Sequence, residues 1–90
     1  MIQQYKVVAA NGDITELVVW LVPNPVWPSQ HSYKYRAAYV VNGKRVVGFY
    51  NERDKGDHVH IGGKESPYTF TMPDQLGEDF IAAIDEYRRK

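Results

Sequence analysis

The chain has 90 residues, of which 43% are hydrophobic and 13% aromatic, and its formal net charge is zero. This composition excludes a disordered chain and predicts one small domain over residues 1–90. Cysteine is absent, which excludes disulfides and a thiolate nucleophile or ligand. No stretch approaches the roughly 18 apolar residues of a membrane span and the first residues lack a signal-peptide layout, so we expect a cytoplasmic protein without membrane contact.

The first elements are predicted as a β-hairpin. Residues 2–10 and 14–22 both read as strands, and Asn11-Gly12-Asp13 separates them. A three-residue turn, with Gly12 at positive φ, keeps the apolar alternation on one face of the hairpin. That face holds Tyr5, Val7, Ala9, Leu17, Val19 and Leu21. Residues 23–28 contain three prolines, which remove three backbone donors and predict a rigid extended loop.

A second hairpin is predicted from residues 33–41 and 45–50 about Asn42-Gly43, a pair typical of type I′ turns. Its simple register pairs Tyr39 with Val46, Ala37 with Gly48 and Tyr35 with Tyr50. Residues 51–56 then form a polar loop, and His58–Ile61 form a short strand that ends at Gly62-Gly63.

The last element is predicted as a helix of about 15 residues that starts near Asp74. Thr71 and Asp74 resemble a capping box, and Pro73 suits the first turn. The apolar stripe consists of Leu76, Phe80, Ala83, Ile84 and Tyr87, and the basic run 88–90 suits the C-terminal end. The expected fold is α+β: an antiparallel sheet of four to five strands, made of two hairpins and a short strand, with one C-terminal helix packed on it.

His58 and His60 form the most informative pair, because strand residues at i and i+2 project from the same face. They follow Lys55 and Asp57, and residues 31–64 carry seven basic and three acidic side chains, a net charge of +4. An anionic ligand near the histidines is therefore one interpretation, and a solvated surface is the other.

Three interpretations of this segment remain open. The histidines could act as general acid and base on RNA, with Lys55, Arg53 or Lys64 supplying positive charge and Tyr33, Tyr35, Tyr39 and Tyr50 offering ring faces to bases. They could instead hold a metal ion together with His31 or Asp57. In the third interpretation the residues are structural, capping turns and allowing tight bends.

The residues that follow resemble one protein family over most of the chain. They are Trp20–Pro23 with Pro25-Val26, Tyr33–Arg36, Val40–Val47, Asn51-Glu52, Lys55–Gly62 with its Gly-Asp-His-Val-His-Ile-Gly run, Ser66–Phe70 and the terminal helix. This pattern is similar to that of the TumE family of small prokaryotic toxins. The chain departs from it at Tyr50, Asp54 and Val59, where the family commonly has aspartate, glycine and arginine.

The resemblance implies the toxin half of a toxin–antitoxin pair, and it implies a small ribonuclease comparable with RelE-like enzymes. It implies His58 and His60 as the acid–base pair, Asp57 as their orienter and Lys55 as a phosphate contact, with Arg36 and Arg53 as further substrate contacts. RNA or the ribosome would be the target, no cofactor or metal would be needed, and the partner would be an antitoxin with a helix-turn-helix domain. A non-catalytic protein- or RNA-binding module, a metal-dependent hydrolase with a His-x-His site, and a homodimer stay open as alternatives.

Overall fold

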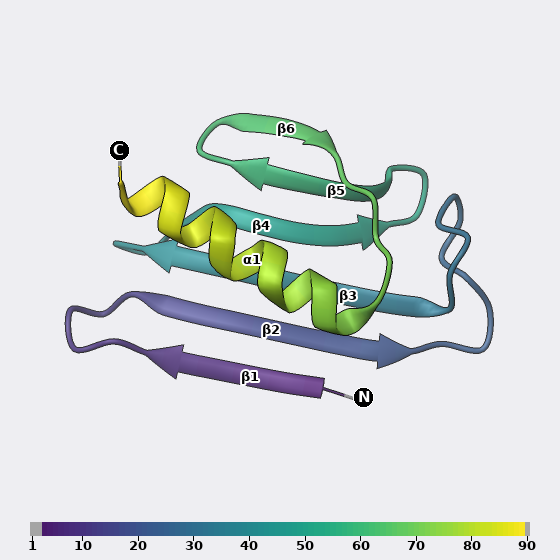
Figure 1. Cartoon of the computed structure of the whole chain (residues 1–90), viewed down its shortest axis with the longest axis horizontal. Helices are drawn as coiled ribbons and strands as arrows, with labels where there is room; N and C mark the ends of the chain where they lie inside the picture. The colour runs from purple at the N-terminus through teal and green to yellow at the C-terminus, as the bar shows by residue number, and fades with distance from the viewer. Residues whose placement is uncertain (1–2, 90) are drawn as a thin grey trace.

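The computed structural model describes residues 3–89. Within this range it has an antiparallel sheet in which strands that follow one another in the chain are neighbours, and one helix after the last strand (Figure 1). The elements are β1 (Gln3–Val8), β2 (Ile14–Leu21), β3 (Tyr33–Val41), β4 (Lys44–Glu52), β5 (Gly56–Ile61), β6 (Lys64–Pro67) and α1 (Pro73–Arg88). The predicted α+β fold is confirmed, with six strands in the described chain instead of four or five.

The first hairpin has the predicted three-residue turn, displaced by one residue. Ala9 N–H donates to the Asp13 carbonyl at 2.8 Å, so residues 10–12 form the turn, and Gly12 has the expected positive φ of 93°. The displacement moves the pairing by two residues, so that Tyr5 pairs with Leu17, but because the turn still has three residues each side chain stays on its predicted face. The alternation prediction is therefore confirmed for the described residues of the two strands, whereas Ile2, in the predicted first strand, lies outside them.

The second hairpin turns at Asn42 and Gly43 as predicted, with φ of 53° and 75°. A β-bulge between Tyr39 and Val40 then shifts the register by one residue, so that Tyr39 pairs with Val47. The predicted pairing of Tyr39 with Val46 is wrong. The same shift pairs Ala37 with Phe49, Ala38 with Gly48 and Arg36 with Tyr50. The bulge brings Val47 and Phe49 to the side where the helix packs, which buries both side chains.

The strand predicted at His58–Ile61 begins earlier, at Gly56, and a sixth strand follows it. Ile61 pairs with Lys64 across a two-residue turn in which Gly62 has a φ of 63°. The sequence prediction missed β6 because all four of its residues are exposed and show no apolar alternation.

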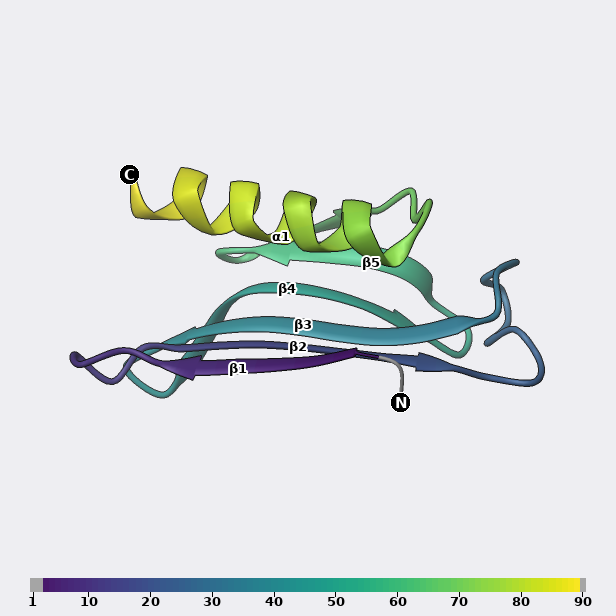
Figure 2. The same ribbon diagram turned by 60° about the horizontal axis from the view of Figure 1, so that its bottom comes forward.

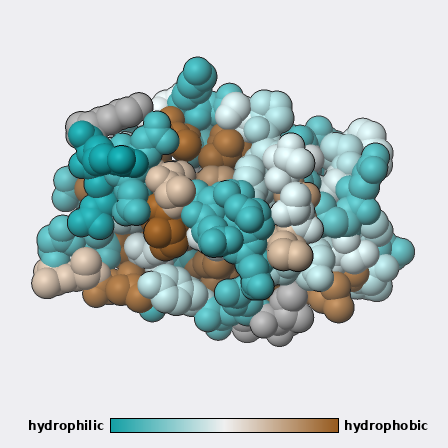
Figure 3. All heavy atoms as spheres, viewed as in Figure 1, coloured by the Kyte–Doolittle hydropathy of each residue, from teal (hydrophilic) through white to brown (hydrophobic). Residues whose placement is uncertain are grey.

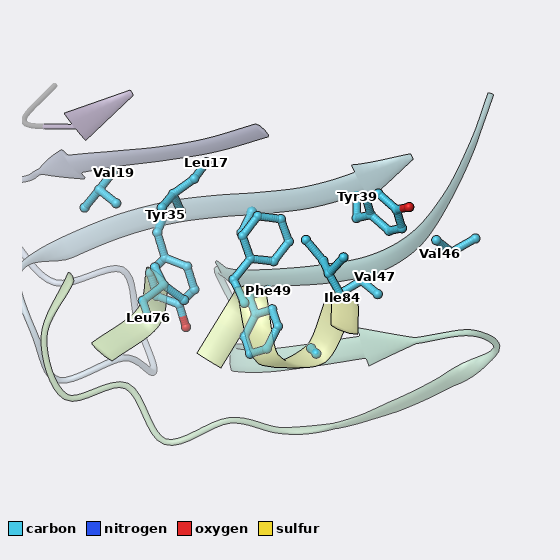
Figure 4. Close-up of a cluster of buried hydrophobic side chains, with 12 residues drawn as sticks. Leu17, Val19, Tyr35, Tyr39, Val46, Val47, Phe49, Leu76 and Ile84 are labelled. Atoms are coloured by element: carbon cyan, nitrogen blue, oxygen red, sulfur yellow. The ribbon is translucent and has the colours of Figure 1, made fainter. Parts of the chain in front are cut away.

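The helix begins at Pro73, which occupies the first turn as predicted. Met72 is the N-cap residue and no side chain bonds to the helix start, so the predicted Thr71–Asp74 capping box is wrong. The predicted apolar stripe is buried at Leu76, Phe80, Ala83 and Ile84, against the strand side chains in Figure 4, and Tyr87 is partly buried. Arg88 lies in the last turn, and Lys90 is outside the described residues.

The helix packs on one side of the sheet, and no described element covers the other side (Figure 2). We call these sides the helix face and the open face. Alternation along the paired strands puts Leu17, Val19, Tyr35, Ala37, Tyr39, Val47, Phe49, Asn51, Asp57, Val59 and Ile61 on the helix face. It puts Glu16, Val18, Trp20, Lys34, Arg36, Ala38, Gly48, Tyr50, His58, His60 and Glu65 on the open face.

Candidate functional site on the open face

His58 and His60 project from the open face, as their i, i+2 spacing predicted. In the β5 ladder His58 lies between Tyr50 and Pro67, and His60 lies between Gly48 and Glu65. Both histidines therefore belong to the sheet surface that the helix leaves uncovered.

The His58 ring is fixed through one of its two nitrogens. Nδ1 lies 3.0 Å from the Gly56 carbonyl oxygen, which only accepts, so Nδ1 carries the proton of the neutral ring. Tyr50 packs edge-on to the imidazole at 3.9 Å between ring centroids. Nε2 then holds a lone pair, and it has no hydrogen-bond partner. The His58 ring is therefore held in one orientation, and its Nε2 lone pair can accept a proton.

A small hollow of about 210 Å³ opens beside His58. Its lining residues are Lys55, Asp57, His58, Glu65, Ser66 and Pro67. Glu65 stands between a cation and the imidazole, because its Oε1 is 3.6 Å from Lys55 Nζ and its Oε2 is 3.8 Å from His58 Nε2. His58 is only 4% exposed, and the solvent-exposed Glu65 side chain is the acidic group next to its Nε2. An exposed ion pair of this kind contributes little stability, and an incoming anion can replace it.

His60 is the second unsatisfied imidazole on this face. It is half-buried, and its Nδ1 has no hydrogen-bond partner. The distance between same-face neighbours in a strand is roughly 7 Å, which lets His58 and His60 contact different oxygens of one phosphodiester.

Cationic and aromatic side chains extend the site across β2, β3 and β4. Arg45 lies over the Tyr50 ring, with Cζ 4.8 Å from the centroid, and its Nη2 donates to the Tyr50 hydroxyl at 3.2 Å. A second depression of about 210 Å³ has Trp20, Lys34, Arg36, Arg45 and Tyr50 among its lining residues. Sequence reasoning selected Arg36 and Tyr50 as RNA contacts but not Trp20, Lys34 and Arg45. The predicted register paired Tyr50 with Tyr35, on the other face from Arg36, and the bulge brings Tyr50 beside Arg36.

Asp57 lines the hollow beside His58, but its carboxylate bonds to other residues, and its predicted role as orienter of the histidines stays a prediction. Its side chain points to the helix face, since neighbouring strand residues alternate. There its carboxylate accepts hydrogen bonds from Ser29 Oγ, from His31 Nε2 at 2.6 Å and from Tyr35 hydroxyl at 2.9 Å. We call these residues, together with Asn51, the Asp57 clamp.

The clamp uses every polar group it contains. His31 Nδ1 accepts from Tyr33 N–H at 3.2 Å, so both nitrogens of that ring are occupied. Asn51 accepts from Tyr35 N–H at 3.0 Å and donates to the Tyr33 carbonyl at 2.8 Å. Burial, together with the nearby Asp57 charge and its hydrogen bond, raises the pKa of Tyr35, so its hydroxyl stays protonated and donates. The clamp joins the proline-rich loop to β3, β4 and β5 and serves a structural purpose.

The other residues predicted to contact RNA do not lie together beside the histidines. Tyr35 is 1% exposed on the helix face, so its ring cannot stack on an RNA base. Arg53 lies exposed in the β4–β5 loop. Lys64 starts β6 and lines a separate depression beside Glu86 and Tyr87, away from the histidines.

The metal-binding alternative lacks a third ligand among the described residues. His31 and Asp57 bond to each other on the helix face, whereas His58 and His60 project from the open face. Within residues 3–89 no three His, Asp or Glu side chains are grouped for a metal ion. In the same range, no helix has the length and apolar character needed to cross a membrane.

No curated protein and no solved structure is significantly similar to the chain. The family model described as "Toxin TumE" matches residues 2–88, which is nearly the whole chain. The match includes the six described strands, the helix and the histidine segment between them. On this evidence the chain belongs to the TumE toxin family.

Proposed function

We propose that this protein is the toxin half of a toxin–antitoxin pair and cleaves RNA on the open face, with His58 and His60 as acid–base residues. The observation that carries the proposal is His58 Nε2, a lone pair with no partner on a ring that Gly56 holds in one orientation. A general base requires this combination of fixed geometry and an available nitrogen.

The proposed reaction is transfer of a phosphodiester to the neighbouring 2′-hydroxyl. His58 Nε2 removes the 2′-hydroxyl proton, and the resulting oxygen attacks phosphorus. His60, in its imidazolium form, protonates the departing 5′-oxygen as the P–O5′ bond breaks. The products are a 2′,3′-cyclic phosphate and a free 5′-hydroxyl, and the proton gained by His58 can return to His60 through water.

Lys55 supplies the positive charge for this reaction. Its ammonium group is paired with Glu65 beside the hollow, and a phosphate that replaces Glu65 there would also uncover His58. Charge that develops on the phosphoryl oxygens would then face a cation within the site. In this scheme, binding of an RNA phosphate would also expose His58 Nε2, the general base.

The remainder of the open face would hold the RNA chain. Arg36, Arg45 and Lys34 provide cations for phosphates, and Trp20 provides a ring face for an unpaired base. Tyr50 is only 9% exposed and Arg45 lies over its ring, so in this scheme Tyr50 positions Arg45 instead of stacking on a base. Arg53, in the exposed loop next to β5, would add a phosphate contact. The target would be free or ribosome-bound RNA, and a separately encoded helix-turn-helix antitoxin would neutralise the protein.

The test is the substitution His58→Asn. Asparagine retains a side-chain N–H for the Gly56 carbonyl but removes Nε2, so folding should be maintained while cleavage of a labelled RNA falls by about 10²–10⁴-fold. The matched control is His31→Asn, which should lower the unfolding temperature and leave cleavage per folded molecule near the wild-type value. Denaturing gels with end-group analysis report cleavage, and circular dichroism reports folding.

Three results would overturn the proposal. His58→Asn could cleave as fast as the wild type, which would remove the histidine from the chemistry. The wild type could bind RNA without cutting it, which would favour a non-catalytic binding module. Activity could disappear in EDTA and return with zinc, which would favour a metal-dependent hydrolase.

A further inference from the structure

The helix covers only part of the helix face. Six strands spaced by about 4.8 Å span roughly 24 Å, whereas a helix with its side chains is about 10 Å wide. Helix α1 packs mainly on β4, and β1 lies at one edge of the sheet, to the side of the helix (Figure 1). A strip of sheet over β1 and β2 is therefore left without a covering element among the described residues.

This strip and the adjacent side of α1 form a groove of about 920 Å³. Tyr5 lines the β1 side and Ile81 lines the helix side, with 47% and 48% of their surfaces exposed. Val7, on the same face of β1 as Tyr5, is 45% exposed. Leu17 and Phe80 line the base of the groove. Figure 3 shows hydrophobic atoms at the surface of this face, below the helix.

The helix side of the groove is acidic. Asp74, Glu78, Ile81 and Asp85 are spaced by four, three and four residues, which places them in one stripe along α1. The groove lining contains these three carboxylates and no lysine or arginine. An apolar groove with negative side chains along one side favours a partner that is both apolar and positively charged.

We propose that this groove binds an amphipathic helix of a partner protein, with an apolar stripe flanked by lysine or arginine. A helix beside α1, at the usual interaxial distance of about 8–10 Å, would complete the second half of the layer over the sheet. Its apolar stripe would contact Tyr5 and Ile81, and its cations would pair with Glu78 and Asp85. The groove and the histidines lie on opposite faces of the sheet, so this inference does not depend on RNA cleavage.

The probe is a fluorescein-labelled peptide of 18 residues with a leucine stripe flanked by lysines. Control peptides carry glutamate in place of lysine, or the same residues with the stripe scrambled. The full chain should bind the lysine peptide at least about tenfold more tightly than either control in fluorescence anisotropy. Amide shifts in an NMR titration should map to β1 and to the Asp74–Asp85 side of α1.

Matched variants localise the binding. Ile81→Lys should weaken binding by at least about tenfold, whereas Val8→Lys, at an exposed residue on the other face of β1, should leave it within about twofold. Glu78→Gln with Asp85→Asn should also weaken binding, in contrast to Glu52→Gln with Glu86→Gln, which removes two charges outside the groove.

The proposal is overturned if the glutamate peptide binds as well as the lysine peptide, or if the shifts map to the open face. It is also overturned if sedimentation shows a dimer that dissociates on Ile81→Lys and that the peptide does not disrupt. In that case the groove is occupied by a second copy of this chain.

Discussion

Removal of the Asp57 carboxylate should be the most destabilising single change in the clamp. The carboxylate accepts three hydrogen bonds, from Ser29, His31 and Tyr35. The Tyr35 side chain is 1% exposed, so its hydroxyl would be left buried without an acceptor, which costs about 1–3 kcal/mol. His31 is 21% exposed, and water can replace part of its lost bond. Together these losses give an expected destabilisation of about 3–5 kcal/mol for Asp57→Ala.

Urea unfolding followed by circular dichroism measures this quantity. A domain of this length has a total stability of about 5–13 kcal/mol, so Asp57→Ala should remove a large fraction of it. The unfolding temperature should fall by roughly 15–30 °C. Asp85→Ala, at an exposed helix carboxylate, is the matched control and should change stability by less than about 0.5 kcal/mol.

A double-mutant cycle with Tyr35→Phe tests whether the loss arises within the clamp. The two substitutions share a hydrogen bond, so their combined effect should be smaller than the sum of the separate effects, by about 0.5–3 kcal/mol. A loss below about 1 kcal/mol for Asp57→Ala would refute the structural assignment. Loss of RNA cleavage with unchanged stability would restore Asp57 to a catalytic role.

Two further predictions follow from buried tyrosine and from the packing of Arg45. The pKa of Tyr35 is raised above that of an unfolded tyrosine, which is near 10. The stability contributed by its neutral hydroxyl is therefore fully present below about pH 10. Above that pH the free energy of unfolding should decrease by up to about 1.4 kcal/mol per pH unit. Urea midpoints from pH 7 to 11 should show this decrease, and Tyr35→Phe should make it smaller without abolishing it, because the pKa values of Tyr39 and Tyr68 are also raised. An equal decrease in Tyr35→Phe would contradict the assignment. A Cβ at residue 48 would lie 3.1 Å from Arg45 Cδ and 3.2 Å from Tyr50 Cε1, so Gly48→Ala should disturb the contact between Arg45 and the Tyr50 ring. RNA affinity should then fall a few-fold with a stability change below about 1 kcal/mol, and unchanged affinity in a filter-binding assay would contradict a role for Arg45.

The elements that depend on local chemistry could be predicted from the sequence. Asn42-Gly43 provides the two positive φ values of a type I′ turn, and the helix stripe from Leu76 to Ile84 repeats with helical spacing. The first hairpin was displaced by one residue, yet its face assignment was correct because the parity of the turn was unchanged. Local signals were sufficient for these features.

Features that depend on distant residues could not be predicted in the same way. The bulge at Tyr39 and Val40 follows from burial of Val47 and Phe49 under the helix, and nothing in the β3 sequence marks it. The bond between His31 and Asp57 joins residues 26 positions apart, and no periodic pattern connects them. The common face of His58 and His60 was predictable, whereas the diversion of Asp57 into a separate cluster required the tertiary fold.

The extra residue in the second hairpin determines which face of the sheet carries His58 and His60. Val46 adds one position to β4, and every later strand takes its orientation from β4 through the ladder. Removal of that position would exchange inside and outside for β4 to β6, so that imidazoles would turn toward the helix and valine and isoleucine toward water. A single aliphatic residue in the neighbouring strand therefore assigns both histidines to the face of the sheet that the helix leaves uncovered.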